Sequence, residues 1–534
     1  MSIKFKNEKL ISNIFLLSIL SYSFFLSFVY STYHIDPWHW GTIASEATDY
    51  ILGFKLFKEI TLMYGPGMPI FFKFINFFYP INYFTIGIIT SIIYLLNLFI
   101  SYLIFLKLSN RTIASILLLV LFILNPYPQV PWSDFYAGTC LTLCAYFMFN
   151  SERKFFLYLS GLFLFLSIIF RNTYLLTIFP AIISFLLIMY FLQIKICLEI
   201  KKIFYSFIFF FFIFLIILFL TQNLQLWFQQ GIGRSGSYFE YSYSLINNPI
   251  TKFFYHLIIP KTLGNFLFLV FYIINFIFIV SLFFSKKKLN NYLGQKKLFI
   301  LALFGLFGII QSFDQFEVWR NLNSSIGIFF TSAYIFHNHK NKILKKIIYY
   351  SALFFFIGFF FFVPNPFYAA KFYTSNFSTF GHMDHKNYRQ PNLSWAWKKY
   401  SKNNFKKIDV KFFGSHRFSS ENIIYYKNMR GLICKYDKII NLTMDRSLVY
   451  ICNKKNGISS TYSDRYPPKF FDSIIQNKIE TGDIDNQTII LANKNFRGNG
   501  LKLLKVESIP KYTRYSKSAL YMGYFDNEIY IYVK

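Results

Sequence analysis

The run from Tyr83 to Leu106 reads YFTIGIITSIIYLLNLFISYLIFL and contains no charged side chain. At about 1.5 Å per residue, a helix of this length is long enough to cross the roughly 30 Å hydrocarbon core of a bilayer. The whole chain has the same character, because its 534 residues are 55% hydrophobic and only 15% charged. Soluble domains carry about 25% charged residues. We therefore predict an α-helical polytopic membrane protein.

Apolar runs of this kind recur along the first two thirds of the chain. We predict eleven spans, at residues 10–33, 83–106, 112–126, 134–149, 155–170, 173–194, 203–221, 264–285, 298–313, 322–336 and 346–363. The third to fifth and the ninth and tenth are short, so a re-entrant or partly interfacial path is the alternative for these. The first run is too long for a removed signal peptide and lacks its small-residue cleavage site, so we expect it to remain as an anchor.

The distribution of basic residues predicts the orientation. With the N-terminus inside and the spans alternating, the inside segments hold 19 Lys and Arg residues, against eight on the outside segments before residue 364. Short loops on the cytoplasmic side carry such an excess. An odd number of spans then places everything after Val363 outside. The same placement of bases argues against a nucleic-acid partner, although the chain has a formal net charge of +31.

The composition changes after residue 363, which predicts a membrane domain at 1–363 and an outside domain at 364–534. The second part holds 28 of the 55 basic and 13 of the 24 acidic residues. Strand-length apolar runs predict a small α/β domain with a helix at 466–479; the runs are Ile423–Tyr426, Ser447–Cys452, Thr488–Ala492 and Glu528–Val533. Its basic surface suits anionic lipid head groups, or else binds nothing specific. Cys434 and Cys452 pair if the compartment is oxidising.

The acidic residues of the membrane part favour one side. Eight of the eleven acids before residue 364 lie on outside segments, namely Asp36, Glu46, Asp49, Glu59, Asp134, Glu240, Asp314 and Glu317. Carboxylates at membrane depth are costly and mark functional sites by default. For each one the alternative is a solvated loop residue or an ion-pair partner of Lys55, Lys58, Arg171 or Arg320. The shared side predicts one working face.

The first outside loop, residues 34–82, holds the densest pattern. It begins His34-Ile35-Asp36-Pro37-Trp38-His39-Trp40-Gly41 directly after the first span. We expect two interfacial helices, at 42–57 and 67–79, with Glu46 and Asp49 on the polar side of the first and the two Trp side chains in the aromatic belt. Asp36 would then lie at head-group level, where a carboxylate can act as a general base or hold a divalent cation, Mg or Mn.

These residues resemble a known group, the bacterial polytopic glycosyltransferases of the C-type superfamily, which are related to the protein mannosyltransferase and aminoarabinose transferase families. The matching pieces are Asp36, Pro37, His39 and Gly41, then Gly53, Lys58 and Glu59, then Tyr64, Gly65 and Pro66. The resemblance implies a sugar donor on a polyprenyl phosphate, an inverting transfer, and an acid of the first loop as base. Arg171 matches a family arginine that contacts the lipid phosphate. The chain departs from the family's late R-x-D-x-x-H stretch, because Asn321, Leu322 and Asn323 follow Arg320.

The predicted site follows from these motifs. The candidate catalytic residues are Asp36, Glu59 and Asp134, and the candidate substrate-binding residues are His39, Tyr64, Arg171, Arg234 and Arg320. For Asp134, at the start of a span, the alternative is a helix N-cap. Arg234 lies in the glycine-rich run Gly231–Gly236, for which a plain flexible loop is the alternative. A metal is left open, with Asp36 as its candidate ligand.

The predicted function is transfer of a sugar from a polyprenyl-phosphate donor to a lipid, glycan or protein acceptor at the outer face of the bacterial inner membrane. The rivals are a lipid-linked glycan flippase or transporter, an O-antigen polymerase or ligase, and a non-enzymatic scaffold. Transporters carry charges or broken helices at mid-membrane, whereas these spans are nearly charge-free at their centres. Because the motif acids all precede residue 364, we expect the C-terminal domain to be separable from the chemistry.

Overall fold

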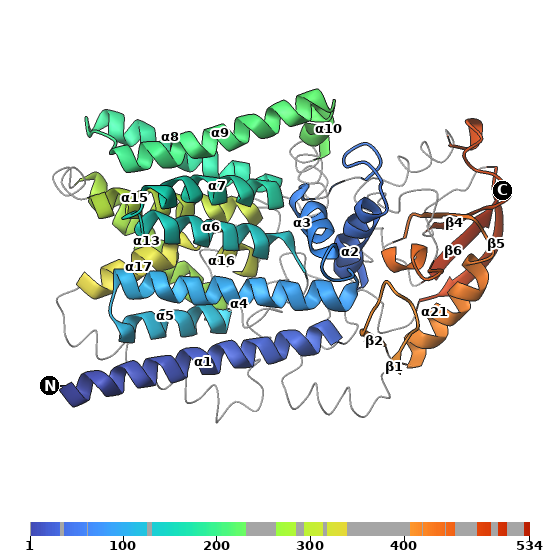
Figure 1. Cartoon of the computed structure of the whole chain (residues 1–534), viewed down its shortest axis with the longest axis horizontal. Helices are drawn as coiled ribbons and strands as arrows, with labels where there is room; N and C mark the ends of the chain where they lie inside the picture. Colours follow the sequence, from blue (N-terminus) through green and yellow to red (C-terminus); the bar gives the residue numbers. More distant parts are fainter. Residues whose placement is uncertain are drawn as a thin grey trace.

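The computed structural model describes residues 2–32, 37–60, 62, 64–124, 131–230, 263–284, 293–312, 318–338, 406–418, 420–443, 445–453, 478–492, 500–509 and 528–534. Long helices run side by side along the longest axis of the molecule, and a small sheet region lies at one end (Figure 1). The N-terminus lies at the opposite end of that axis (Figure 1). The chain therefore places its two predicted parts one after the other along this axis.

Helices occupy ten of the eleven predicted spans. They are α1 (Ser2–Thr32), α4 (Tyr83–Leu108), α5 (Arg111–Leu124), α6 (Ser133–Phe149), α7 (Lys154–Phe170), α8 (Leu175–Phe191), α9 (Leu198–Leu220), α13 (Leu263–Phe283), α15 (Leu293–Phe307) and α17 (Gly327–Asn338). The predicted span at 322–336 is divided between α17 and the short helix α16 (Val318–Ser324). The eleventh, 346–363, lies outside the described residues, as does the predicted domain boundary at 363/364.

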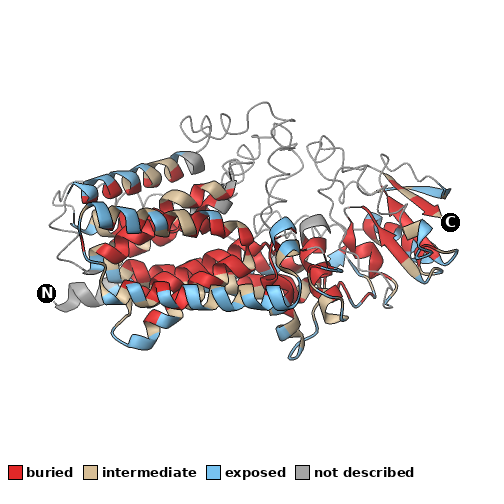
Figure 2. Ribbon diagram, turned by 90° about the horizontal axis from the view of Figure 1, so that it is seen from above, coloured by how far each residue is buried: buried red, intermediate tan, exposed pale blue. Residues whose placement is uncertain are grey.

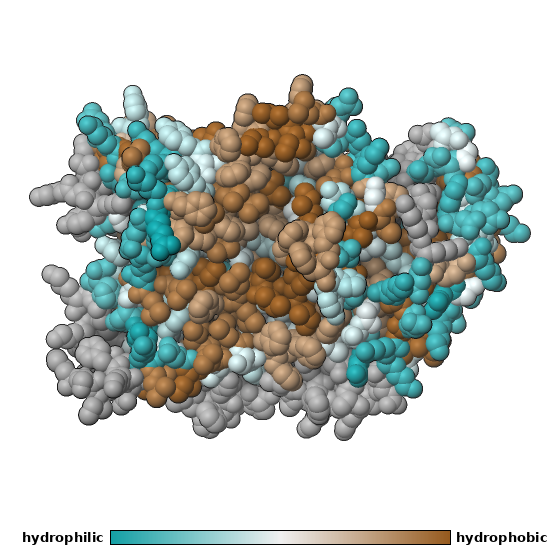
Figure 3. Space-filling model, viewed as in Figure 1, coloured by the Kyte–Doolittle hydropathy of each residue, from teal (hydrophilic) through white to brown (hydrophobic). Residues whose placement is uncertain are grey.

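Five helical segments in the described part are long and apolar enough to cross a membrane, by length and composition: Tyr83–Leu108, Asn172–Phe191, Leu198–Leu220, Phe266–Phe283 and Gly294–Gln311. Apolar residues form a broad band around the middle of the molecule, and polar residues gather toward both ends (Figure 3). This is the surface that a bilayer requires, because lipid solvates the apolar band and water the two ends. The chain is an integral membrane protein.

Burial differs from helix to helix across the bundle. Helix α6 is buried over most of its length, whereas α9 exposes Phe and Ile side chains. In the ribbon view the inner helices of the bundle are mostly buried and the outer helices are exposed along one side (Figure 2). Gly138 of α6 allows the close approach of α16, because a Cβ there would lie 2.8 Å from the Cβ of Asn323. Small residues at such crossings are what membrane helices use to pack tightly. The exposed Phe209 and Phe212 of α9 are then lipid-facing.

Four of the loops predicted to lie inside gather at one end of the bundle. Lys107 Nζ donates to Asn150 Oδ1 over 2.8 Å, and Lys297 Nζ donates to Ser151 Oγ over 2.6 Å. Lys296 Nζ donates over 2.9 Å to the backbone carbonyl of Lys195. These bonds join the loops after α4, α6 and α8 to the start of α15. The alternation of the predicted spans is therefore supported by the packing at this end.

Two helices of the first loop lie at the other end, which we call the site end: the end of the bundle that carries α2 (Pro37–Ile51), α3 (Gly67–Asn76) and the sheet region (Figure 1). Both run crosswise to the bundle. Helix α2 begins and ends earlier than the predicted bounds 42–57. It ends at Ile51 because Gly53 has φ +100°, and residues 52–60 form turns. The prediction for the second helix, 67–79, agrees with α3 at its start and is three residues too long.

The expected surroundings of α2 were wrong. Glu46 and Asp49 are 2% and 1% exposed, so they do not form a polar outer face. Trp40 is also buried, between Gly87 of α4 and His416 of the C-terminal region, and it does not anchor the protein in the lipid interface. The sequence showed these residues as loop residues next to a span, whereas segments far along the chain cover them.

The C-terminal region contains a four-stranded sheet in the order β3-β4-β6-β5. Its strands are β3 (Lys438–Asn441), β4 (Thr488–Ala492), β5 (Lys502–Ser508) and β6 (Glu528–Val533), and β1 (Lys406–Lys407) pairs with β2 (Arg417–Phe418). Strands β3 and β4 are parallel, and the β4–β6 and β6–β5 pairs are antiparallel. The predicted strands at 488–492 and 528–533 are confirmed, and so is the small α/β architecture.

Two of the predicted strands were wrong. Residues 423–426 belong to α21 (Ser420–Ile433), where Tyr425, Tyr426, Met429 and Ile433 are buried at helical spacing. Residues 447–452 form a turn of 3₁₀ helix, η6 (Arg446–Val449), followed by turns. The predicted helix at 466–479 lies almost entirely outside the described residues.

Alternate residues of the sheet enter two different apolar clusters. Ile489, Leu491 and Ile531 join α21 and the helices of the bundle in one continuous core, whereas Ile490 and Tyr532 face a smaller separate cluster. This is the two-residue period of a strand buried on both faces. The core of the C-terminal region is thus continuous with that of the bundle.

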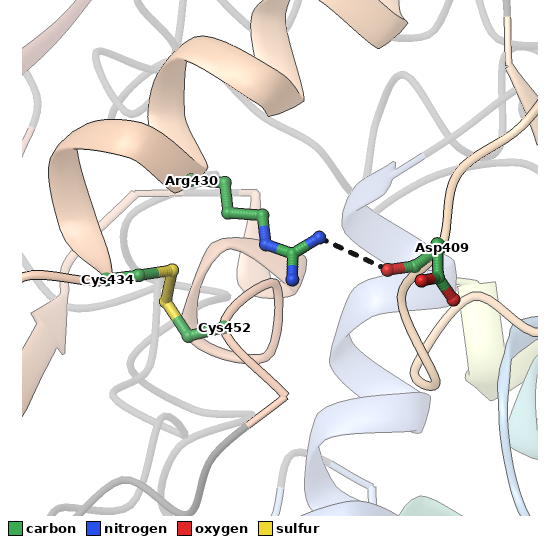
Figure 4. The surroundings of a disulfide bond; sticks show 4 residues. All are labelled: Asp409, Arg430, Cys434 and Cys452. Atoms are coloured by element: carbon green, nitrogen blue, oxygen red, sulfur yellow. Dashed lines mark hydrogen bonds between the residues drawn. A yellow bond between two sulfur atoms is a disulfide. The ribbon is translucent and has the colours of Figure 1, made fainter.

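A disulfide joins Cys434, just after α21, to Cys452, just after η6 (Figure 4). The pairing expected from the sequence is therefore present. Close by, Arg430 Nη1 donates to the carbonyl oxygen of Asp409 over 3.3 Å (Figure 4). Together these links fix α21 to the turns on either side of it.

Candidate active site

A buried ion pair lies at the site end of the bundle. Arg171, directly after α7, places its Nε 3.0 Å from Asp134 Oδ1 in the first turn of α6, and the two side chains are 6% and 0% exposed. Arg171 Nε also lies 3.2 Å from Thr173 Oγ1, and Nη1 lies 3.4 Å from Ser133 Oγ. Asp134 occupies a helix N-terminus, where the backbone dipoles favour a negative charge. The pair therefore fixes the guanidinium at a defined place.

Aromatic rings cover this guanidinium. The Arg171 Cζ atom lies 4.9 Å from the ring centre of Tyr64, and the Tyr64 ring lies 4.6 Å from that of Trp132. A cation over an aromatic face gains about 0.5–1 kcal/mol when exposed and more when water is excluded. Two residues from distant parts of the sequence, Tyr64 and Arg171, are thus brought into contact.

The segment Tyr64-Gly65-Pro66-Gly67 is held against the last turn of α7. Asn172 N donates to the carbonyl of Tyr64 over 2.6 Å. Gly65 has φ +151°, and a Cβ there would lie only 2.5 Å from the carbonyl oxygen of Ile169. Only glycine combines this backbone conformation with this close approach. The glycines of the motif therefore allow the first loop to cover Arg171.

Polar side chains extend the cluster toward the 3₁₀ turn η3 (Gly308–Ser312). Thr173 Oγ1 donates to Gln311 Oε1, and Gln311 Nε2 donates to the carbonyl of Thr173 over 2.7 Å and to Thr177 Oγ1 over 2.9 Å. Beside it, Trp227 Nε1 donates to Asn172 Oδ1 over 3.0 Å. Buried polar groups that are satisfied in this way give one rigid arrangement.

Three of the eight predicted site residues meet in this cluster: Asp134, Tyr64 and Arg171. Glu59 takes no part in the contacts of this cluster. Its exposed carboxylate accepts a hydrogen bond from Lys55 N over 2.6 Å, which closes the turn between the two residues. His39 lies in the first turn of α2 and Arg320 lies in α16; the structure describes the backbone of these two residues and not their side chains. Asp36 and Arg234 lie outside the described residues.

Several members of the cluster were not predicted, among them Ser133, Thr173, Gln311 and Trp227. Ser133 adjoins the predicted Asp134, and Thr173 lies two residues after Arg171, so a search around each charged residue would have found both. Gln311 is a lone amide near the end of an apolar run, which is an expensive position for a polar group and therefore a usable signal. Trp227, buried at 2% exposure, gave none because the sequence is rich in aromatic residues.

The cluster suits an anionic ligand. A guanidinium carries five donor hydrogens, and the contacts to Asp134, Thr173 and Ser133 involve only Nε and Nη1. Hydrogens of a guanidinium fork such as those on Nη2 are suitable donors to a phosphate or carboxylate oxygen. The ion pair with Asp134 would hold the fork in one orientation while such an oxygen binds.

A divalent cation fits this cluster poorly. The carboxylate of Asp134 is already paired with the Arg171 guanidinium, whose positive charge would repel a metal ion. Among the residues that the structure describes, no three His, Cys, Asp or Glu side chains lie close enough to hold a metal. Asp36, the candidate ligand named from the sequence, is not among them. The described cluster therefore suits a negatively charged group better than a metal ion.

Comparison with known proteins places the fold. No family model matches the chain, and no curated protein matches it in sequence. Among solved structures, ArnT from Cupriavidus metallidurans, bound to undecaprenyl phosphate, is similar over 97% of each chain, with a TM-score of 0.50 and 9% sequence identity. An identity this low is informative about the fold alone. The chain therefore shares, over nearly its whole length, the fold of a polytopic membrane protein that was solved with a polyprenyl phosphate bound.

Proposed function

We propose that this protein is a membrane glycosyltransferase of the C-type fold, which moves a sugar from a polyprenyl-phosphate donor to a lipid, glycan or protein acceptor. The observation that carries the proposal is the contact between Tyr64 and Arg171, which brings the third piece of the first-loop motif onto the predicted phosphate ligand. The similarity in fold to ArnT supports it independently of that motif.

In this proposal Arg171 binds the phosphate of the donor, Asp134 orients Arg171, and Tyr64 closes the site from the first loop. Asp36, the residue immediately before α2, removes the proton from the acceptor hydroxyl. His39, Glu59, Arg234 and Arg320 remain candidates from the sequence for binding and assistance. Each group acts on a substrate held at the head-group level, where the polyprenyl chain remains in lipid and the sugar in water.

The position of the charges favours chemistry over transport. The buried charged residues of the described bundle helices lie near helix ends: Asp134 and Arg171 at the site end, and Lys296 and Lys297 at the other. A transporter for a charged lipid head group would need polar groups along its path through the membrane. The described bundle helices carry no charged side chain at their centres and place the ion pair at one rim.

We also propose that the N-terminus is cytoplasmic and that the site end and the C-terminal region face the periplasm or the cell exterior. The excess of basic residues on the opposite loops supports this orientation. The Cys434–Cys452 disulfide supports it as well, because such bonds persist outside the cytoplasm. A reporter that works only outside the cytoplasm, fused after Lys534, should be active, and cytoplasmic activity would contradict the orientation.

Two measurements test the function. Mass spectrometry of the lipid that copurifies with the protein should find a polyprenyl phosphate or its sugar adduct, and bulk phospholipid alone would count against the proposal. In a transfer assay, Asp36→Asn should lower turnover by about two to four orders of magnitude, which is the usual contribution of a positioned general base. The matched control is Asp483→Asn, because the Asp483 side chain is 59% exposed in the C-terminal region. Equal turnover of the two variants would show that Asp36 is not the base.

A further inference from the structure

The C-terminal region is docked on the site end by specific bonds. Tyr83 N, at the start of α4, donates to the carbonyl of Phe412 over 3.0 Å. His416 Nδ1 donates to the carbonyl of Ser31, in the last turn of α1, over 2.8 Å. Gly414, with φ +59°, fits against Asn82, whose Oδ1 would lie 2.3 Å from any Cβ at that glycine. These contacts fix the region to the ends of two bundle helices.

The same region packs along one stripe of α2. A Cβ at Gly41 would lie 3.0 Å from the Cβ of Arg446, so the glycine of the first-loop motif makes room for η6. One and two turns further along α2, the Ser45 carbonyl and the Asp49 carboxylate face Tyr450. Residues four apart lie on one face of a helix. The segment from Arg446 to Tyr450 therefore follows α2 from its first turn to its last.

A short polar contact in this interface joins Tyr450 to Asp49. The Tyr450 hydroxyl lies 2.6 Å from Asp49 Oδ1 and 3.3 Å from the carbonyl of Ser45. Asp49 is 1% exposed and Tyr450 is 7% exposed, so water contributes little to the solvation of this carboxylate. Hydrogen bonds to charged acceptors are short and about twice as strong as neutral ones. The contact therefore holds α2 in register with the C-terminal region.

Tyr450 is itself held on three sides. Its ring stacks on that of Phe412 with centroids 4.2 Å apart. The carboxylate of Asp445 accepts a hydrogen bond from Ser447 N over 3.2 Å and so starts the turn of η6. Two residues beyond Tyr450, Cys452 is bonded to Cys434. The hydroxyl of Tyr450 is thus presented to α2 from a rigid turn.

We propose that Tyr450 is a positioning residue for the active site, and that it acts through Asp49 by fixing α2. Helix α2 begins at Pro37, directly after Asp36 in the sequence, so fixing α2 fixes the chain next to the proposed base. A displacement of about 1 Å at a reacting group can cost a hundredfold in rate. This inference rests on the proposed function, and it assigns to the C-terminal region a direct effect on the chemistry. It is the opposite of the separable domain expected from the sequence.

The test uses the full-length protein in lipid nanodiscs. Tyr450→Phe removes one oxygen and should lower kcat by about 10- to 100-fold while the KM for the donor stays within about twofold, since the phosphate cluster around Arg171 is untouched. Asp49→Leu breaks the same contact and should also lower kcat, and Asp49→Asn, which keeps an acceptor oxygen for the Tyr450 hydroxyl, should keep most of the rate. The double variant Tyr450→Phe with Asp49→Leu should lose less than the sum of the two single losses, because both substitutions break the contact between these two residues.

The matched control is Tyr530→Phe, the same chemical change in the same region. The Tyr530 hydroxyl donates to Glu528 Oε2 on the outer sheet, away from α2, and the variant should keep the parental rate. Loss of rate in both Tyr variants, or fully additive losses in the double variant, would overturn the inference.

A second measurement separates this inference from the proposed function. Hydrogen exchange of the α2 amides, followed by mass spectrometry, should speed up about tenfold or more in Tyr450→Phe and stay unchanged in Tyr530→Phe. This readout needs no substrate. Parental exchange in Tyr450→Phe would show that the contact does not fix α2, whatever the assay finds. Faster exchange with an unchanged kcat would show that α2 does not position the chemistry. A parental protein without transfer activity would refute the function, while the exchange result still decides whether Tyr450 fixes α2.

Discussion

Breaking the Arg171–Asp134 pair should separate its contribution to stability from its contribution to binding. Asp134→Asn leaves a guanidinium that is only 6% exposed without its counter-charge. Removing one partner of a buried pair typically costs about 3–5 kcal/mol, because the remaining charge is desolvated and unpaired. Arg171→Met should cost a similar amount for the opposite reason, because the Asp134 carboxylate then lacks the guanidinium. The two single variants should therefore unfold at clearly lower temperature in detergent.

The double variant Arg171→Met with Asp134→Leu removes both charges and keeps the volume of the site nearly filled. Replacing a whole buried pair by apolar residues is often neutral or stabilising. We expect its free energy of unfolding to return to within about 1 kcal/mol of the parent value. Its affinity for the polyprenyl-phosphate donor should nevertheless stay low, because the guanidinium proposed to bind the phosphate is gone.

Thermal unfolding and donor binding, measured on the same four proteins, provide the comparison. Stability that recovers while binding stays lost would assign the pair to ligand recognition. Recovery of both would refute the reasoning, since the pair would then serve only the fold. Arg171→Lys adds a finer test: it keeps the charge but loses the planar fork, so it should bind the donor more weakly than the parent and more tightly than Arg171→Met.

Two further predictions concern the first loop and the C-terminal region. Gly65→Ala should lower both the free energy of unfolding and the affinity for the polyprenyl-phosphate donor, because its Cβ would lie 2.5 Å from the α7 backbone. In the control Gly431→Ala the new Cβ lies in open space within α21, so this variant should be neutral or slightly stabilising in thermal unfolding. Burial raises the pKa of the Asp445 carboxyl to about 6, so the folded state keeps this proton at pH values where the unfolded state has lost it. The contribution of this group to the free energy of unfolding therefore falls as the pH rises from about 4 to 6. Burial lowers the pKa of His416 to about 4, which gives the opposite slope over the same range. Asp445→Asn should therefore reveal a rise in stability between pH 4 and 6.5, and a pH profile that the substitution leaves unchanged would contradict this assignment.

The sequence predicted the helices well, since hydrophobic length is a local property that a bilayer enforces. The run 83–106 became α4 with two further residues at its end. The sequence also predicts which distant loops lie together, because alternating spans bring alternate loops to the same end of the bundle. The sequence predicts that Tyr64 and Arg171 lie on the same side of the membrane, and the structure brings them into contact at the site end.

The environment of α2 could not be predicted, because it depends on residues about 400 positions later in the chain. Glu46, Asp49 and Trp40 have the sequence pattern of an exposed interfacial helix, yet all three are buried, and the C-terminal region contacts Asp49 through Tyr450 and Trp40 through His416. The strand expected at 447–452 failed for a related reason. The Asp445 side chain captures the Ser447 amide and winds the chain into η6, which an apolar pattern does not reveal.

The strand order β3-β4-β6-β5 places the latest of the four strands in the chain, β6, in the interior of the sheet. Strand β5 has no partner in this sheet until β6 arrives, because β6 pairs with both β4 and β5. The sheet can therefore close only after residues up to Val533 have been synthesised and, in the proposed orientation, have crossed the membrane. During export the unpaired edges of β4 and β5 are open to mispairing with other chains, a hazard of exposed strand edges. Biogenesis of this protein should accordingly depend on periplasmic or extracellular folding factors more than its membrane helices alone would require.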